Sequence, residues 1–246
     1  MAAYTTIDDP EAYFQTKLYT GNATSDTSIT LDGDTDMQPD LVWIKERNST
    51  SNNEINDAVR GATKWILSDS NSAEGTEAEG LTAFNSDGFT LGDNGAYNQS
   101  SSYTYVAWCW KANGAGSSNS SGDLTVTTSA NTTAGFSIVK GTSDSTASRT
   151  IGHGLGTVPD AIISKNLDAT YNWDCFFKTL GYNASLQINQ TAVPRTDAWG
   201  SSTFTSTLFQ TINGYTSNNG DEYVYYCFSN RQGFSKVGSF EGNGNA

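Results

Sequence analysis

The sequence is short of histidine, cysteine and long apolar runs, and each shortage excludes a class of protein. Its three cysteines are odd in number and widely spaced, so they do not form a disulfide framework, which indicates synthesis in a reducing compartment. No stretch approaches the roughly 18 apolar residues of a membrane-spanning helix. The first residues, MAAYTT, have neither a basic region nor an apolar core. We therefore expect no membrane partner and no secretory signal.

Basic side chains are also scarce. The chain carries 13 basic and 26 acidic side chains, a formal net charge of −13. Residues 1–123 hold 6 basic and 18 acidic groups, whereas residues 124–246 hold 7 and 8. A surface this negative repels phosphate, so nucleic acid is excluded as a partner. The charge either keeps the protein soluble or attracts a cationic partner to the first half.

Aromatic and small polar residues are abundant. The chain has 6 Trp, 12 Tyr, 11 Phe and 24 Gly, with many Ser, Thr and Asn. So many aromatic rings need a core, which argues against disorder. The small polar residues are typical of tight turns between short strands. The composition predicts an all-β fold.

Two aromatic segments are the strongest strand candidates, and we call them the anchor strands. They are residues 103–110 (YTYVAWCW) and residues 222–228 (EYVYYCF), with Cys109 and Cys227 at matching places. Aromatic and β-branched runs of this length between turn signals predict strands buried on at least one face. The two cysteines, and Cys175 in similar company, are expected to fill the core as small hydrophobes.

The rest of the chain repeats in register with the anchor strands. Pro39 and Pro159 each begin a segment of Pro-Asp, apolar residues and Lys. Phe89 and Phe209 each lie 50 residues after their proline, and the anchor-strand cysteines lie 70 and 68 residues after it. Several coincidences in one register predict a duplicated module of roughly 100 residues.

This repeat predicts two tandem antiparallel β-sandwich modules. The boundaries are an N-terminal arm at 1–13, module 1 at 14–111, a flexible Gly/Ser/Asn-rich linker at 112–135 and module 2 at 136–246. Within the linker, residues 123–128 alternate like a short edge strand. Residues 233–244 (GFSKVGSFEGNG) repeat the opening-strand pattern, with FEGN matching YTGN at 19–22. That segment either begins a third module or completes the second.

Several segments together resemble a repeated module of tailed-phage virion proteins, familiar from phages of marine bacteria and cyanobacteria. They are AYTTIDDPEAYFQTKLYTGN, PDLVWIKERN, DAVRGATKW, DGFTLG, TYVAWCWKANG, FSIVKG, IGHGLGTVPD and GFSKVGSFEGNG. The resemblance implies a concanavalin-like, jelly-roll sandwich in tail fibres or other exposed virion proteins, often in tandem. It assigns no catalytic or ligand-binding residue.

Polar motifs offer little catalytic chemistry. His153, in GHGLG, has no second His or Cys nearby, so a glycine-rich turn is favoured over a metal site or a base. Asp32, Asp34 and Asp36 are a weak calcium candidate, because the loop lacks the Gly and Glu of an EF-hand. The acidic run at residues 74–79 lies in one polar loop and does not predict a pair of glycosidase carboxylates. No cofactor and no catalytic residue are predicted.

Aromatic side chains in turns are the remaining ligand candidates. Tyr97, Trp199 and Tyr215 lie in Asn/Gly-rich or polar segments and are expected to be exposed, where they can stack on sugar rings of a host surface glycan.

The expected function is a non-enzymatic virion protein, as a capsid-decoration, fibre or appendage subunit made in the host cytoplasm and exposed on the particle. Its partners are itself, as a homo-oligomer, and other virion proteins. Assembly is expected through edge strands and the N-terminal arm, with Tyr4, Asp8, Asp9 and Tyr13 as candidates. The alternatives are a receptor-binding adhesin for host glycan and, third, a polysaccharide hydrolase.

Overall fold

The computed structural model describes residues 5–196, 198–200 and 204–244, and this part of the chain is all-β, as the composition predicts. It consists of antiparallel sheets joined by loops, two 3-10 turns and one four-residue helix. None of its helices is long and apolar enough to cross a membrane.

The first half of the chain builds a six-stranded antiparallel sheet around the first anchor strand. In spatial order its strands are β1 Phe14–Thr20, β9 Thr104–Trp110, β3 Leu41–Glu46, β4 Asn53–Asp57, β5 Gly61–Leu67 and β6 Gly75–Thr76. The anchor strand β9 lies between β1 and β3 and pairs along its full length with β1. Its position inside the sheet explains its apolar sequence.

The second half builds another six-stranded antiparallel sheet around the second anchor strand. In spatial order its strands are β10 Ser117–Asn119, β11 Val126–Asn131, β12 Phe136–Thr142, β19 Glu222–Phe228, β14 Ala161–Asn166 and β15 Asp174–Phe177. The anchor strand β19 pairs with β12 on one side and β14 on the other. Thus both Pro-Asp segments lead into a strand beside an anchor strand.

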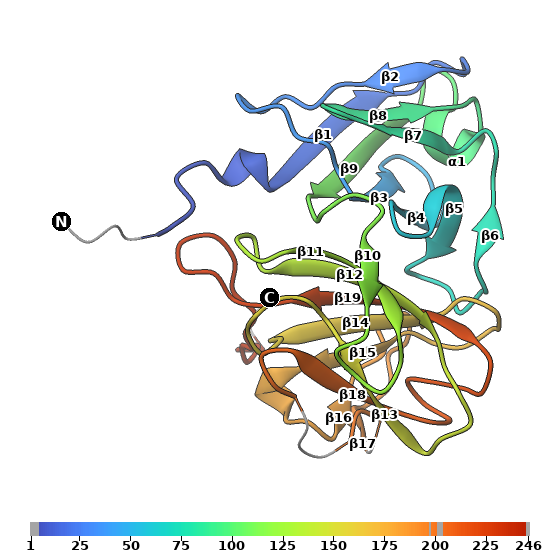
Figure 1. Cartoon of the computed structure of the whole chain (residues 1–246). Coiled ribbons are helices and arrows are strands. Elements are labelled where there is room, and N and C mark those ends of the chain that lie inside the picture. Colours follow the sequence, from blue (N-terminus) through green and yellow to red (C-terminus); the bar gives the residue numbers. More distant parts are fainter. Residues whose placement is uncertain (1–4, 197, 201–203, 245–246) are drawn as a thin grey trace.

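Smaller sheets cover the outer faces. In the first half, β2 Thr27–Ile29, β8 Gly88–Leu91 and β7 Leu81–Asn85 form a three-stranded sheet. In the second half, β13 Ser148–Gly152 pairs with β18 Leu208–Ile212, and β16 Ala184–Ser185 pairs with β17 Arg195–Thr196. Figure 1 shows the first half above the second, with the small sheets at the top and the bottom.

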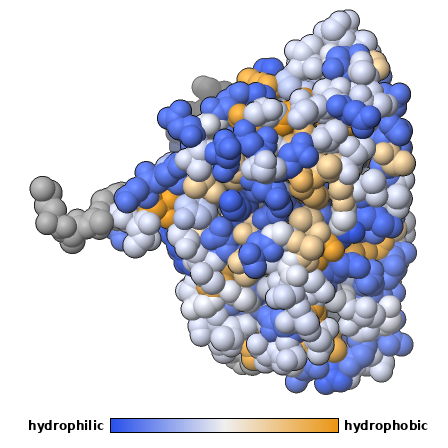
Figure 2. Space-filling model, turned by 45° about the horizontal axis from the view of Figure 1, so that its top comes forward, coloured by the Kyte–Doolittle hydropathy of each residue, from blue (hydrophilic) through white to orange (hydrophobic). Residues whose placement is uncertain are grey.

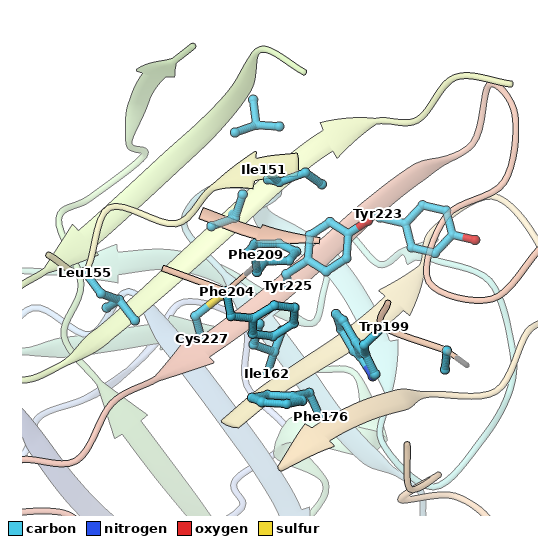
Figure 3. Packing of buried hydrophobic residues seen from close by; sticks show 13 residues of the cluster. Ile151, Leu155, Ile162, Phe176, Trp199, Phe204, Phe209, Tyr223, Tyr225 and Cys227 are labelled. Carbon is cyan, nitrogen blue, oxygen red and sulfur yellow. The ribbon is translucent and has the colours of Figure 1, made fainter. Parts of the chain in front are cut away.

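Alternate residues of each anchor strand face different clusters of buried residues. Tyr105, Ala107 and Cys109 of β9 face a cluster shared with the three-stranded sheet, which we call the first outer cluster. Tyr223, Tyr225 and Cys227 of β19 face the second outer cluster, shared with β13 and β18 (Figure 3). The alternation follows from the two-residue period of a strand.

The opposite faces of the two large sheets pack against each other, and we call this third cluster the seam. It contains Leu41, Ile55, Ile66, Ala112, Phe136, Ile138, Leu167, Trp173, Cys175, Val224 and Tyr226. All three cysteines are buried and free, which confirms their expected role as core residues. Because the seam joins strands from both halves, the large sheets are buried on both faces.

The predicted linker differs from the structure. Within the 112–135 range, residues 117–119 form β10 and residues 126–131 form β11, and both strands extend the second sheet beyond β12. Ser129 of β11 is fully buried, and its hydroxyl accepts a hydrogen bond from the Asn113 amide at 2.7 Å. Small polar residues fit a closely packed strand as well as a flexible connector, so their composition alone is ambiguous.

Residues 233–244 also depart from their strand-like sequence. They join no sheet in the structure and so do not complete the second one. Arg231 and Ser235 form an isolated bridge that closes a turn, and Phe240 beyond it is 94% exposed. We call residues 231–244 the tail.

Candidate functional site

A cavity of about 230 Å³ lies at one end of the seam, where the two large sheets meet the N-terminal arm and the tail. We call it the aromatic socket. Its lining is Tyr13, Phe14, Trp110, Ala134, Gly135, Phe136, Phe228, Phe234 and Ser235. In Figure 1 it lies on the side where the dark blue N-terminal segment and the red C-terminal turn come together. Most of these lining residues are aromatic.

Strand pairing places the central rings of the socket. Phe14 of β1 is opposite Trp110 of β9, with ring centroids 4.9 Å apart. Phe136 of β12 is opposite Phe228 of β19, with centroids 5.0 Å apart. Trp110 lies 6.4 Å from each of the latter two rings, so the pairs meet across the seam. Aromatic pairs of this kind stabilise neighbouring strands.

The N-terminal arm and the tail form the rim of the socket. Tyr13 packs edge-on against Phe234 of the tail at 6.2 Å. Asp9 precedes the 3-10 turn η1 Pro10–Ala12 and accepts hydrogen bonds from the Glu11 amide and the Thr35 hydroxyl. Of the predicted assembly residues, Asp9 and Tyr13 therefore make contacts within the chain and Asp8 is exposed, whereas Tyr4 lies outside the described residues.

The socket offers little to a polar ligand. Of its nine lining residues, only Tyr13, Trp110 and Ser235 carry a polar group in the side chain. A sugar ring would bury hydroxyl groups that find few partners there, at a cost of about 1–3 kcal/mol for each unpaired group. An apolar or aromatic group has no such cost. The chemistry of the lining thus favours a hydrophobic side chain.

Two of the three predicted ligand residues are wrong, because the structure buries them. Tyr97 is 1% exposed, on the helix α1 Gly95–Asn98, with its hydroxyl 3.1 Å from Asn56 Oδ1. Trp199 is fully buried in the second outer cluster beside Phe204 and Phe209 (Figure 3). Polar neighbours in sequence do not reveal that both segments fold back over a sheet.

Tyr215 is the one predicted ligand residue that reaches the surface. It is 37% exposed, and the Arg195 guanidinium lies 4.7 Å from its ring centroid. A cation over one face of the ring leaves the other side as the only face for a ligand. On the face that Figure 2 shows, apolar residues form separate areas within a mostly hydrophilic surface.

Of the aspartates in the weak calcium candidate, Asp32 has a charged partner within the chain. Asp32 forms an ion pair with Lys17 of β1, and the Asp34 amide donates to a Glu11 carboxylate oxygen at 2.9 Å. Across the described ranges, no three His, Cys, Asp or Glu residues gather in a way that would hold a metal ion.

His153 is a buried structural residue of the second half. Its Nδ1 accepts a hydrogen bond from the Leu155 amide at 3.2 Å, and its Nε2 lies 3.3 Å from the Thr205 carbonyl oxygen. The amide contact leaves the proton on Nε2, which donates to that carbonyl. Burial lowers the pKa of His153 to about 4, so the ring is neutral at physiological pH.

A buried charged cluster at the seam was not anticipated. Arg60 contacts Asp57 through Nε at 2.5 Å and Glu74 through Nη1 at 3.2 Å, and Tyr226 of the second anchor strand donates to Asp57 at 2.7 Å. Burial opposes the charge on Arg60, but the carboxylate of Asp57 outweighs it and raises the pKa of the guanidinium. The sequence DAVRG holds a signal for this pair, because Asp57 and Arg60 are three residues apart. Glu74 was expected in a solvated loop, but its side chain is mostly buried.

Comparisons with known proteins give a family without an assigned activity. None of the curated proteins matches this chain, and none of the solved structures matches it. A family model described as a domain of unknown function matches residues 9–246, a range that includes both anchor strands, the seam and the socket. The chain therefore belongs to the family described as Domain of unknown function (DUF7483).

Proposed function

We propose that this chain is a non-enzymatic structural subunit of a tailed-phage particle, as a capsid-decoration, fibre or appendage protein. The observation that carries the proposal is the aromatic socket, whose lining suits a hydrophobic side chain of a protein partner better than a small polar substrate. The resemblance of the sequence to virion modules supplies the kind of particle. The partners are then further copies of the chain and other virion proteins.

The proposal includes a finer view of the fold, with two tandem concanavalin-like jelly-roll modules. The strand orders β1-β9-β3-β4 and β12-β19-β14-β15 support it, because each places an anchor strand between an opening strand and a Pro-Asp strand. The outer clusters support it too, since each large sheet has its own smaller sheet over its outer face. On this view the seam joins one module to the other.

An open sheet edge favours assembly through protein contacts. Strand β1 is the last strand of the first sheet on its side, and Leu18 in its middle is exposed. A free edge offers backbone groups to a strand of another chain. The arm continues directly into this strand, which fits the expectation that the arm and the edge strands make the assembly contacts.

Composition of the particle tests the proposal. Purified particles of the source phage should contain this chain at a constant copy number by quantitative mass spectrometry. Gold-labelled antibody to the chain should mark one place on the particle in electron micrographs. Absence of the chain from washed, infectious particles would remove the proposal.

A receptor-binding adhesin is a second candidate function, favoured by Tyr215. Its ring is exposed beside Arg195 on the nearly neutral second half, a suitable place to stack on host surface glycan. If so, Tyr215→Ala should abolish competition by the purified protein for host adsorption. The matched control is Tyr171→Ala, since Tyr171 is also an exposed tyrosine of the second half. Equal competition by both variants, with no signal on a glycan array, would argue against this candidate.

A further inference from the structure

We infer that the aromatic socket of one copy receives Phe240 from the tail of a second copy of this chain. The inference rests on the proposed structural function and deepens it, because it names the partner of the socket and the side chain that enters it.

Phe240 is an apolar side chain that is exposed to solvent in its own chain. It is 94% exposed, the highest value among the large hydrophobic side chains of the described residues. Within the tail, the Val237 amide donates a hydrogen bond to Asn230 Oδ1 at 2.5 Å. Phe240 follows three residues later, beyond this anchored turn. An exposed phenylalanine beyond a fixed turn is well placed to reach a neighbouring molecule.

The socket has the size and chemistry for a phenyl ring. Its volume is about 230 Å³, and an apolar cavity of about 150 Å³ is enough to bind benzene. Phe14, Trp110 and Phe228 offer ring faces and edges to an entering ring. A buried aromatic side chain in a preformed pocket is the usual centre of a protein interface.

Charge near the two elements is complementary. The arm beside the socket carries Asp8, Asp9 and Glu11 with no basic residue between residues 5 and 13, whereas the tail carries Arg231 and Lys236 against Glu241. The part of the rim that the arm forms is therefore negative, whereas the tail, which also contributes Phe234 and Ser235 to the rim, is slightly positive. Opposite charges around an apolar contact increase the association rate and fix the orientation of the partner.

The sequence of the tail points to a segment that becomes ordered on a partner. Residues 233–239 (GFSKVGS) match residues 135–141 (GFSIVKG), which lead into and form β12. The same pattern lies inside a sheet in one case and outside any sheet in the other. A strand-like segment outside the sheets of its own chain can pair with an edge of another copy.

Phe240 lies outside the lining of the socket, so a contact between Phe240 of one copy and the socket of another is heterologous. Each copy offers both, and the chain of contacts either closes into a ring or continues as a fibre. Both products are compatible with a virion subunit.

The direct test is sedimentation velocity on the full chain over a range of concentrations. The wild-type protein should self-associate, and Phe240→Ser should weaken that association roughly 30-fold or more, as expected when an aromatic anchor is truncated. The matched control is Val193→Ser, because Val193 is 83% exposed but outside the socket and the tail. This control should associate like the wild type.

A complementary variant tests the socket from the other side. Ser235 is an exposed lining residue, so Ser235→Trp should plug the cavity without disturbing the core. This variant should also lose self-association, with an unchanged circular dichroism spectrum. Mixing it with Phe240→Ser should restore a heterodimer and nothing larger, because Ser235→Trp keeps Phe240 and Phe240→Ser keeps an open socket.

Two results would overturn the inference. The first is a wild-type protein that stays monomeric at all concentrations, including one in which Phe240 has folded into its own socket. The second is Phe240→Ser associating like the wild type. Either result, in a protein that is present in the particle, removes the inference and leaves the proposed function. Self-association through Phe240 in a protein absent from the particle would keep the inference and remove the proposed function.

Discussion

The two large sheets each place an anchor strand between an opening strand and a Pro-Asp strand, but different side chains pack under their outer faces. Under the outer face of the first sheet, the Tyr97 hydroxyl lies near Asn56 and the carboxyl group of Glu54. Under that of the second sheet, Trp199 and Phe209 pack in a cluster of rings (Figure 3). The acidic side chains are also distributed unevenly between the halves, since residues 1–123 hold 18 of the 26. The first outer cluster is therefore apolar with a polar contact at Tyr97, whereas the second is richer in aromatic rings.

The largest expected effect compares the two core phenylalanines at matching places. Phe209 contacts the rings of His153, Trp199, Phe204 and Tyr225, whereas the ring contact of Phe89 is with Tyr19. Phe209→Ala should lower the free energy of unfolding by about 5 kcal/mol and Phe89→Ala by about 3 kcal/mol, the two ends of the usual range. Urea unfolding of both variants measures the difference. A loss in Phe89→Ala as large as in Phe209→Ala would mean that the aromatic cluster adds nothing.

The next effect tests the charged cluster at the seam. Asp57→Ala should cost about 3 kcal/mol, because it leaves Arg60 buried with only Glu74 as a charged partner and removes the acceptor of Tyr226. In a domain of this size each kilocalorie lowers the melting temperature by roughly 2–4 °C. The control is Asp144→Ala, whose pair with Arg149 is open to solvent and should matter little. Similar losses in both variants would contradict the role given to the buried pair.

Glu54 predicts a loss of stability in the first half as the pH rises. Burial raises the pKa of Glu54 from 4.5 to about 7, so the folded state holds the proton more tightly than the unfolded state. This contribution is full below pH 4.5 and is lost as the pH rises to about 7, up to about 3 kcal/mol at 1.36 kcal/mol per pKa unit. Glu54→Gln should remove this slope from urea midpoints measured across the range. An unchanged slope would mean that another group titrates.

His153 predicts the opposite dependence in the second half. Burial lowers the pKa of His153 from 6.5 to about 4, so the unfolded state binds the proton more tightly. Its contribution is full above pH 6.5 and is lost as the pH falls to about 4, again up to about 3 kcal/mol. His153→Gln should flatten the acid side of the stability profile and leave the alkaline side as it is. If the acid side stays steep, carboxylates account for it.

The smallest effect compares surface ion pairs on the strands that flank the two anchors. Lys17 of β1 pairs with Asp32, and Lys140 of β12 pairs with Glu222. Each Lys→Ala change should cost less than about 1 kcal/mol, because both pairs are partly solvated. Thermal unfolding at low salt and at about 1 M salt checks this, since screening should remove the difference. A larger loss on one side would show that the flanking strands are not equivalent.

Local patterns were enough to predict the four most apolar strands. The two anchor strands and the two Pro-Asp segments have the apolar runs and turn signals of buried strands, and the structure confirms them as β9, β19, β3 and β14. The run EYVYYCF is apolar at nearly every position, a pattern typical of strands buried on both faces. This pattern is the sequence signal for the seam. The prediction of burial on at least one face did not decide whether the second face is buried too.

Contacts between residues far apart in the chain could not be predicted from the sequence. Asp57 and Tyr226 are 169 residues apart and meet because two sheets stack. The socket likewise needs rings from β1, β9, β12 and β19 together with the arm and the tail. Tyr97 and Trp199 were misjudged for the same reason, since their polar neighbours in sequence do not reveal that both side chains are buried against a sheet. Patterns of period two report local conformation and not which loop covers which sheet.

Because the seam joins the two repeated halves, we expect them to unfold together and not one at a time. A protease cut between residues 111 and 117 would not release two soluble fragments, because each would expose a sheet face with rings such as Trp110, Trp173 and Tyr226. The indole of Trp173 adds a specific tie, since it donates hydrogen bonds to the Leu67 and Ser70 carbonyl oxygens of the first half. Its fluorescence would therefore report separation of the halves and global melting as a single event.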